Sequence, residues 1–273
     1  MASNISISAL YTYPVKSCGA LQHEQMILDE RGPLWDRRWM VVDADGIFVT
    51  QRSHPTMAII QPSLSADTLT LTAPGMPALT VPLTAERDEP LPVTIWQDTC
   101  DAWDEGRAAA EWFSHFLEGD LRLVRMTDGW FRPVNPKYAP ETAQTGFSDG
   151  FPLLLVSEES LADLNTHLQA REAQPVPMSR FRPNVVVRGA SPYAEDGWRT
   201  VQVGAVTLDV LKPCARCVIT TVDQHTGSIP DNNEPLGTLS TYRKQNSKVM
   251  FAQNAVHRAA GTLALGAVVE VLA

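Results

Sequence analysis

The chain has 273 residues, of which 44% are hydrophobic and 19% charged, as in a soluble globular protein with one large or two ordinary domains. The formal net charge of −9 argues against nucleic acid or an anionic membrane surface as the main partner, because both attract basic proteins. No apolar run approaches the roughly 18 residues of a membrane span, and the N-terminus shows no secretory signal. The four cysteines are unevenly spaced and do not suggest a disulfide framework, so we expect a reducing, cytoplasmic location.

Short strands dominate the first hundred residues. Their alternating or apolar runs, separated by Pro and Gly, predict strands over residues 5–13, 38–43, 47–50, 68–72, 79–83 and 93–96. The pair Asp45-Gly46 between two of these runs predicts a hairpin. The first helix is predicted over residues 107–117, where Trp112 and Phe113 belong to one apolar face and Gly119 follows the end.

The rest of the chain predicts a mainly β, α+β fold with a few helices. Residues 127–150 are rich in Pro, Asp and Gly and predict a long loop, and loops of this length are often functional. Ser157 is the expected N-cap of a helix over residues 158–168, and a short helix is expected over 235–243. Strands are predicted over residues 121–126, 152–156, 184–188, 200–203, 206–211, 218–222, 249–252 and 268–272.

The segment at residues 212–223 carries the most informative chemistry. It places Cys214 and Cys217, with Arg216 between them, after one predicted strand and before the next. A thiolate is a soft metal ligand and a strong nucleophile. A guanidinium favours an ionised sulfur nearby and can hold a phosphate with two hydrogen bonds. The combination suggests a cofactor that carries both a soft metal and a phosphate.

Three other interpretations of this Cys-x-x-Cys pair stay open on local grounds. A structural zinc site needs four nitrogen or sulfur ligands, and only the single cysteines Cys18 and Cys100 and the nearby His225 remain to supply them. A thioredoxin-like pair has its second cysteine in the first turn of a helix, whereas the residues after Cys217 are β-branched and favour a strand. The third interpretation is a pair of small apolar core residues, although Arg216 is awkward in a core.

Basic side chains recur where the predicted strands end. Loops at strand ends are where β-rich scaffolds usually build binding sites, so the convergence of these groups predicts a positive pocket around Cys217. Each of these side chains taken alone is more typical of a solvated turn or surface. The basic residues at strand ends are Lys16, Arg37, Arg52, Arg182 and Arg216.

These segments resemble the MOSC-domain proteins, in the branch that contains the mitochondrial amidoxime-reducing component and the bacterial proteins that detoxify N-hydroxylated bases. The resemblance covers nearly the whole chain, and the motifs occur in the family's order and approximate spacing. The motifs are Pro14-Val15-Lys16-Ser17, Asp36-Arg37, residues 157–165, Phe181-Arg182-Pro183-Asn184, residues 214–223 and Phe251-Ala252-Gln253-Asn254.

The resemblance implies an N-terminal β-barrel-like domain over residues 1–120 and a β-barrel MOSC domain over residues 121–273. It implies a molybdenum cofactor, a molybdenum–pyranopterin, held between the two. Cys217 is the implied molybdenum ligand and catalytic residue, and Asp149 is the implied acidic residue near the metal. The residues implied to bind or surround the cofactor are Lys16, Ser17, Arg37, Arg52, Arg182, Asn184, Arg216, Thr220, Gln253 and Asn254.

Two features depart from the family's pattern. Some bacterial relatives continue into a ferredoxin-like domain with an iron–sulfur cluster, whereas this sequence ends at Ala273 and has no spare cysteines for one. We therefore expect no such domain here. The usual glycine after the motif phenylalanine is Ala252, which is expected to crowd the backbone.

The activity that the resemblance implies is the reduction of N-hydroxylated compounds (hydroxylamines, amidoximes and N-hydroxylated bases) to amines, a detoxification reaction. The electrons are expected to come from a separate reductase or carrier protein. A sulfur carrier or a chaperone for the cofactor is the leading alternative, because a MOSC domain also ends the molybdenum-cofactor sulfurases. A pyridoxal-phosphate protein with Lys16 as the Schiff base is a second alternative, and it leaves the cysteine motif unused.

Overall fold

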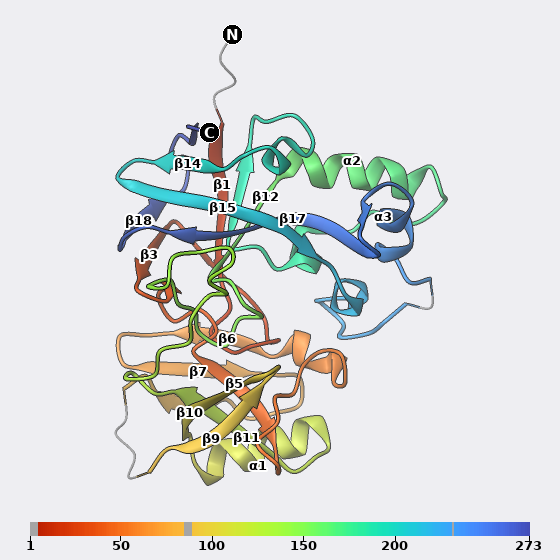
Figure 1. Ribbon diagram of the computed structural model, residues 1–273. Coiled ribbons are helices and arrows are strands. Elements are labelled where there is room, and N and C mark those ends of the chain that lie inside the picture. The colour runs from red at the N-terminus through yellow and green to blue at the C-terminus, as the bar shows by residue number, and fades with distance from the viewer. Residues whose placement is uncertain (1–4, 85–88, 231) are drawn as a thin grey trace.

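The computed structural model describes residues 5–84, 89–230 and 232–273. This part of the chain is mainly β, as predicted, and contains the helices α1 (Arg107–Leu117), α2 (Glu158–Gln169) and α3 (Leu236–Tyr242). The chain forms two stacked bodies, an upper one with α2 and α3 and a lower one with α1 (Figure 1). Among the helices of the described residues, none has the length and apolarity needed to span a bilayer.

A nine-stranded sheet forms the upper body. Its apolar face packs around Leu10, Leu155, Val187 and Leu208, and α2 and α3 help to cover the other face around Phe251. Among the described strands of this sheet, β12 and β13 are the one parallel pair. The strands are, in spatial order, β19 (Glu270–Val271), β14 (Thr200–Val203), β15 (Val206–Ala215), β17 (Lys248–His257), β12 (Leu153–Ser157), β13 (Val185–Arg188), β1 (Ser6–Thr12) and β2 (Leu21–His23), with β16 (Lys244–Gln245) beside β17. A small sheet of β18 (Gly261–Ala264), β3 (Gln25–Asp29) and β4 (Gly32–Pro33) completes this body.

Two sheets and α1 form the lower body. Its core gathers Trp39, Leu69, Trp112 and Phe113, so that the apolar face of α1 packs on strands from both sheets. One sheet has the order β5 (Trp39–Asp43), β11 (Leu121–Met126), β10 (Asp98–Asp104) and β9 (Leu91–Ile95). The other has the order β6 (Gln61–Leu64), β7 (Thr68–Thr72) and β8 (Leu79–Pro82).

Chain order and spatial order differ at both ends of the lower body. β1 leaves the upper sheet before the chain enters the lower body, and β11 pairs with β5 in the lower body although it follows residue 120. The two bodies therefore do not coincide with the sequence domains expected over residues 1–120 and 121–273, and that division stays a prediction. The two bodies are tied together by chain crossings on both sides, which places residues far apart in sequence at their junction.

Two predicted strands are wrong. Residues 218–222 form the 3₁₀ turn η4 (Val218–Thr221), because the hydroxyls of Thr220 and Thr221 donate to the carbonyls of Cys217 and Val218 and stabilise a turn. Residues 47–50 form isolated bridges after the turn at Gly46, so the hairpin is present with a short second arm. The remaining short turns are η1 (Pro55–Ile59), η2 (Met178–Phe181) and η3 (Ala194–Asp196).

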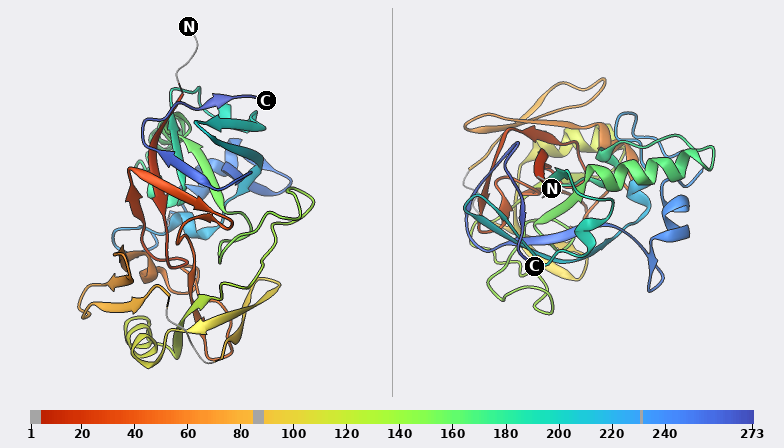
Figure 2. Two further views of the ribbon diagram at one scale, coloured as in Figure 1. Left: turned by 90° about the vertical axis from the view of Figure 1, so that its left-hand side faces the viewer. Right: turned by 90° about the horizontal axis from the view of Figure 1, so that it is seen from above.

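The long loop between β11 and β12 is present as predicted. It runs from the lower to the upper body along one side of the molecule (Figure 2). Arg132, which is 4% exposed, donates from Nη1 to the carbonyl oxygens of Gly146 (2.9 Å) and Ser148 (2.7 Å). Its Nε donates to Asp98 Oδ2 at 2.8 Å, so a buried guanidinium fixes the stretch that carries Asp149.

Candidate functional site

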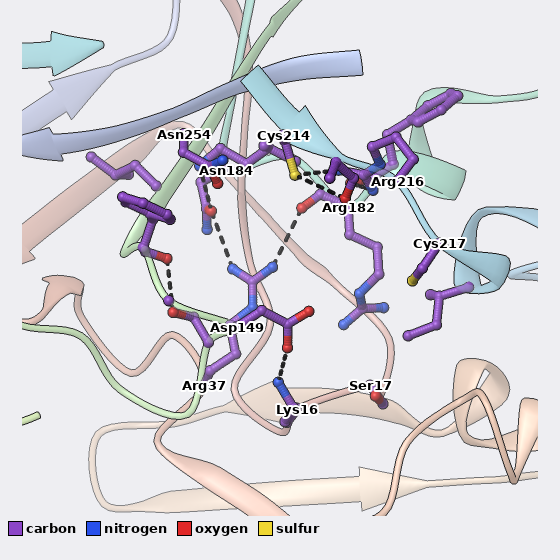
Figure 3. A pocket seen from close by; sticks show the side chains of 18 of the residues that line it. Lys16, Ser17, Arg37, Asp149, Arg182, Asn184, Cys214, Arg216, Cys217 and Asn254 are labelled. Atoms are coloured by element: carbon purple, nitrogen blue, oxygen red, sulfur yellow. Dashed lines mark hydrogen bonds and ion pairs between the residues drawn. The ribbon is translucent and has the colours of Figure 1, made fainter. Parts of the chain in front are cut away.

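A cavity of about 260 Å³ lies where the two bodies meet. Six cations and one carboxylate line it, an unusual balance in a chain with a net charge of −9. Figure 3 shows Lys16 and Ser17 along one side of the cavity and Cys214, Arg216 and Asn184 along the other. The charged residues that line it are Lys16, Arg37, Arg52, Arg182, Lys212, Arg216 and Asp149.

Lys16 and Asp149 form an ion pair inside the cavity. Lys16 Nζ lies 2.5 Å from Asp149 Oδ1 and 2.9 Å from the carbonyl oxygen of Phe147. Burial lowers the pKa of Lys16, and the neighbouring carboxylate opposes that shift. Burial raises the pKa of Asp149, but the charges of Lys16 and Arg52 and the hydrogen bonds from Lys16 and Trp96 outweigh it and hold this pKa below its ordinary value. The Asp149 side chain is 58% exposed, so its free edge faces the solvent of the cavity.

Arg52 connects this ion pair with Cys217. Its Nη2 lies 3.3 Å from Cys217 Sγ and 3.8 Å from Asp149 Oδ2. The guanidinium lies over the Trp96 ring, 4.8 Å from the centroid. Cys217 itself is half-buried at the N-cap of η4, so its sulfur lies at the cavity surface and not in a core.

Arg37 and Arg182 lie on the Tyr13 ring, with their guanidinium carbons 4.3 Å and 4.2 Å from its centroid. Arg37 Nη1 also donates to Asp36 Oδ2 (2.5 Å) and to Asn184 Oδ1 (3.1 Å). Burial lowers the pKa of Arg182 to about 10, which leaves it charged at neutral pH. Among the described residues, its side-chain acceptor is Gln224 Oε1, at 3.3 Å. Both arginines have positive φ values, 46° and 55°, which are uncommon for residues other than glycine.

Arg216 lies between the two cysteines in space as well as in sequence. Its Nη2 donates to the carbonyl oxygen of Phe181 at 2.9 Å, and its Nη1 lies 3.1 Å from Cys214 Sγ. Its Nε is buried and, among the described residues, has no hydrogen-bond partner. Cys214 is half-buried, and its sulfur is therefore accessible from the same cavity as Cys217.

Comparison with known proteins matches both halves of the chain to described domains. Residues 4–120 match the MOSC N-terminal beta barrel domain, and residues 142–270 match the MOSC domain. The chain is 38% identical over 248 residues to mitochondrial amidoxime-reducing component 1 of Mus musculus, covering 87% of this chain and 71% of that protein. It is 34% identical over 286 residues to the Homo sapiens component 1, covering 96% and 81%.

This chain belongs to the MOSC-domain family. The resemblance that the sequence motifs suggest is confirmed, together with the mainly β fold. The relatives are named as mitochondrial proteins, and the cytoplasmic location expected for this chain stays a prediction.

Ten of the twelve site residues predicted from the sequence line the cavity. The other two do not line it. Thr220 is buried behind Cys217 and donates to its carbonyl oxygen at 2.9 Å, and Gln253 donates to Asp196 Oδ1 at 2.6 Å. The ten lining residues are Lys16, Ser17, Arg37, Arg52, Asp149, Arg182, Asn184, Arg216, Cys217 and Asn254.

Several contributors are not among the predicted site residues, although Asp36 belongs to the quoted motif Asp36-Arg37. Tyr13, Asp36 and Trp96 act as supports for the charged groups, and Lys212 and Phe151 line the cavity themselves. Tyr13 and Lys212 adjoin recognised motifs, so proximity to Lys16 and Cys214 was an available signal. Trp96 gave none, because its partners lie 44 and 53 residues away along the chain.

The donor set of the cavity fits a molybdenum–pyranopterin. It offers one half-exposed sulfur, Cys217, as a soft metal ligand, and cations on several sides as phosphate donors. Arg216 Nε is a buried donor without a hydrogen-bond partner among the described residues, so this guanidinium can still donate to a bound group.

The other interpretations of the cysteine pair find little support. In the described residues, no group of three or more His, Cys, Asp or Glu side chains is placed to hold a metal ion, so the zinc interpretation lacks a ligand set. Cys217 precedes a 3₁₀ turn and not a helix, and neither it nor Cys214 is a core residue. The comparisons give no support to the pyridoxal-phosphate alternative, and Lys16 Nζ is engaged by Asp149 and Phe147.

Proposed function

We propose that this chain reduces N-hydroxylated compounds with a bound molybdenum cofactor and electrons from a separate protein. The observation that carries the proposal is the position of Cys217 Sγ on a cavity that gathers six cations around one carboxylate. The names of the relatives, amidoxime-reducing components, support this activity and this substrate class. The reaction takes an N–OH compound, two electrons and two protons to the corresponding N–H compound and water.

The residues divide into holding and orienting roles. Cys217 would bind the metal through its sulfur, and Arg182, Arg216, Arg37 and Ser17 would hold the pterin and its phosphate. When bound, the cofactor supplies the redox chemistry that breaks the N–O bond, while the protein supplies orientation and charge.

Asp149 and Lys16 would act on the substrate and its protons. Because the pKa of Asp149 lies below its ordinary value, the carboxylate is ionised at neutral pH and accepts hydrogen bonds from a substrate N–H or O–H group. It is therefore an orienting group. Burial lowers the pKa of Lys16, and its ammonium donates to Asp149 inside the cavity, so Lys16 is the candidate for delivering a proton.

The test uses protein made in a host that synthesises the cofactor. Purified protein is expected to contain about one molybdenum per chain and to convert benzamidoxime to benzamidine with a reduced viologen. It is expected to fail with NADH alone, since the sequence contains no Gly-x-Gly-x-x-Gly dinucleotide fingerprint. Cys217→Ser should abolish turnover, and Cys214→Ser, three residues away on the same cavity, is the matched control that should retain it.

Two outcomes would replace the proposal. If Cys214→Ser is inactive while Cys217→Ser is fully active, the metal ligand is assigned to the wrong cysteine. If molybdenum-loaded protein reduces nothing with a viologen but hands cofactor or sulfur to an acceptor protein, the carrier or chaperone alternative is correct.

A further inference from the structure

Trp96 is an exposed aromatic residue in contact both with Arg52, which lies beside Cys217, and with Asp149. The residue is 46% exposed. The centroid of its ring lies 5.0 Å from the centroid of the Phe48 ring and 4.8 Å from the Arg52 guanidinium carbon. Its Nε1 donates to Asp149 Oδ1 at 3.2 Å. Arg52 in turn reaches Cys217, and Asp149 reaches Lys16. Trp96 thus contacts one member of each of two pairs, Arg52 with Cys217 and Asp149 with Lys16, although it does not itself line the cavity.

The backbone at Trp96 is strained. β9 and β10 pair with Ile95 opposite Asp98, which leaves Trp96 and Gln97 as a two-residue hairpin loop. Both favoured turns for such loops need a positive φ at the first loop residue, a position usually taken by Gly, Asn or Asp. Trp96 has a φ of 57° there. A bulky side chain in this conformation costs stability, and strain of this kind concentrates at functional sites.

We propose that Trp96 is a positioning residue that holds Arg52 over Cys217 and Asp149 beside Lys16, and that the hairpin tolerates its strained conformation for this reason. The ring restricts the Arg52 guanidinium by a cation–π contact, and the indole N–H fixes one oxygen of the carboxylate. The second oxygen of Asp149 lies 3.8 Å from Arg52 Nη2 and, on a side chain that is 58% exposed, can still accept a hydrogen bond from the substrate. The part of this inference that concerns turnover rests on the proposed function.

The first experiment separates the ring from the N–H group. In molybdenum-loaded protein, Trp96→Ala and Trp96→Gly are expected to lower kcat/KM for benzamidoxime about 10-fold or more with unchanged molybdenum content, since misplacement of orienting groups has effects of this size. Trp96→Phe keeps a ring over Arg52 and is expected to recover part of the loss. Full activity in Trp96→Gly at normal molybdenum content would overturn the inference.

The second experiment measures strain in cofactor-free protein. Trp96→Ala and Trp96→Gly both remove the indole, and they differ only in the Cβ at a φ of 57°. We expect Trp96→Gly to melt roughly 2–4 °C above Trp96→Ala, the reverse of the usual order. Glu118 is the matched control, because it has the same φ of 57° at the exposed end of α1, far from the cavity residues in sequence and not among them.

Glu118→Gly should also melt above Glu118→Ala, and both should keep wild-type turnover. If Trp96→Ala melts at or above Trp96→Gly while the Glu118 pair shows the expected order, Trp96 carries no strain and the inference fails.

A third measurement does not depend on turnover. Alkylation of Cys217 by iodoacetamide in cofactor-free protein is followed by peptide mass spectrometry, with Cys214 as the internal reference. Because a guanidinium beside a sulfur accelerates its alkylation, the Cys217 rate should fall about threefold or more in Trp96→Gly and stay unchanged in Glu118→Gly. An unchanged Cys217 rate would show that Arg52 does not depend on Trp96. If wild-type protein with bound molybdenum reduces no substrate, the proposed function fails, and the cofactor-free measurements still decide the role of Trp96.

Discussion

The cations that line the cavity form two groups with different partners. We call Lys16, Arg37 and Arg52 the lower side and Arg182, Lys212 and Arg216 the upper side. On the lower side each cation lies beside a carboxylate, Lys16 and Arg52 beside Asp149 and Arg37 beside Asp36. On the upper side Arg182, Arg216 and Lys212 have no carboxylate partner among the described residues. Their neighbours are amide, carbonyl and sulfur acceptors and the rings of Tyr13, Phe181 and Tyr138.

This difference indicates where an anion binds. A buried guanidinium without a counter-charge keeps its desolvation cost until an anion approaches, and burial already lowers the pKa of Arg182 to about 10. The cations of the lower side are already paired with the protein's own carboxylates. The upper side is therefore expected to contribute most to phosphate binding, with a lesser contribution from Arg37, while Lys16 and Asp149 on the lower side act on substrate and protons.

The largest expected effect comes from removing charge on the upper side. Arg182→Ala or Arg216→Ala deletes a charge-assisted hydrogen bond to the phosphate, about 1.5–3 kcal/mol, so molybdenum content should fall well below that of the wild type. Molybdenum per chain is measured by elemental analysis, and the unfolding midpoint of cofactor-free protein is measured beside it. Arg188→Ala, an exposed arginine at the end of β13, is the control and should change neither. Lost stability with normal molybdenum content would make Arg182 and Arg216 structural.

On the lower side, Asp149→Asn is expected to keep molybdenum and lose turnover. The variant also leaves the buried Lys16 ammonium without its counter-charge, which should cost about 1–2 kcal/mol at neutral pH after solvent screening of the half-exposed carboxylate. Thermal unfolding of cofactor-free protein measures this difference. Equal loss of molybdenum in Asp149→Asn and Arg182→Ala would erase the distinction between the two sides.

The stability difference between wild type and Asp149→Asn should depend on pH in a definite direction. The pKa of Asp149 is lower in the folded protein than its ordinary value of 3.8, so the unfolded chain takes up this proton first as the pH falls. The stability from the ionised carboxylate is complete above its unfolded pKa and is lost as the pH falls through the folded one. The gap between wild type and Asp149→Asn should therefore be constant near neutral pH and shrink below about pH 4–5. A gap that widens on acidification would contradict the lowered pKa of Asp149.

Tyr13 connects the two sides, with Arg37 and Arg182 on its ring and its hydroxyl donating to the carbonyl oxygen of Pro183 at 3.0 Å. Tyr13→Phe keeps the ring and leaves one buried carbonyl unpaired, so we expect a loss of about 1 kcal/mol in unfolding free energy with normal molybdenum content. Tyr13→Leu removes the aromatic ring as well and should lower both the unfolding free energy and the molybdenum content. If Tyr13→Leu retains full molybdenum content, the ring does not hold the two arginines in place.

Local periodicity was enough to predict the regular helices and strands. The irregular segments depend on contacts that no local sequence pattern shows. α1 and β11 have the predicted bounds because an apolar helix face and a β-rich run each decide their own structure. The strand predicted at residues 218–222 failed because threonine hydroxyls favoured a turn over the β preference of branched side chains.

The same division holds for the candidate site. Basic residues at strand ends were found through their recurrence and through the family motifs, and ten of the twelve predicted residues do line one cavity. Gln253 failed because strand alternation sends it to the face opposite Asn254, where it meets Asp196. The supports Tyr13 and Trp96 depend on packing between bodies, which local sequence does not encode.

The smallest expected effect concerns the backbone of β17 beside the upper side of the cavity. Ala252 occupies the position where the family usually has glycine, and its φ is 69°, in the left-handed region that glycine enters freely. Ala252→Gly should relieve this strain and stabilise the protein by about 0.5–1 kcal/mol, less the small loss of its buried methyl group. Thermal unfolding of cofactor-free protein measures the gain.

The matched control for Ala252→Gly lies three residues further along the same strand. Ala255 is fully buried and, unlike Ala252, is not among the residues with a positive φ, so Ala255→Gly should destabilise the protein by about 1 kcal/mol. The two substitutions are chemically identical, and only the backbone conformation gives them opposite signs. If both destabilise equally, the alanine at position 252 is not strained, and the crowding expected from the missing family glycine is absent.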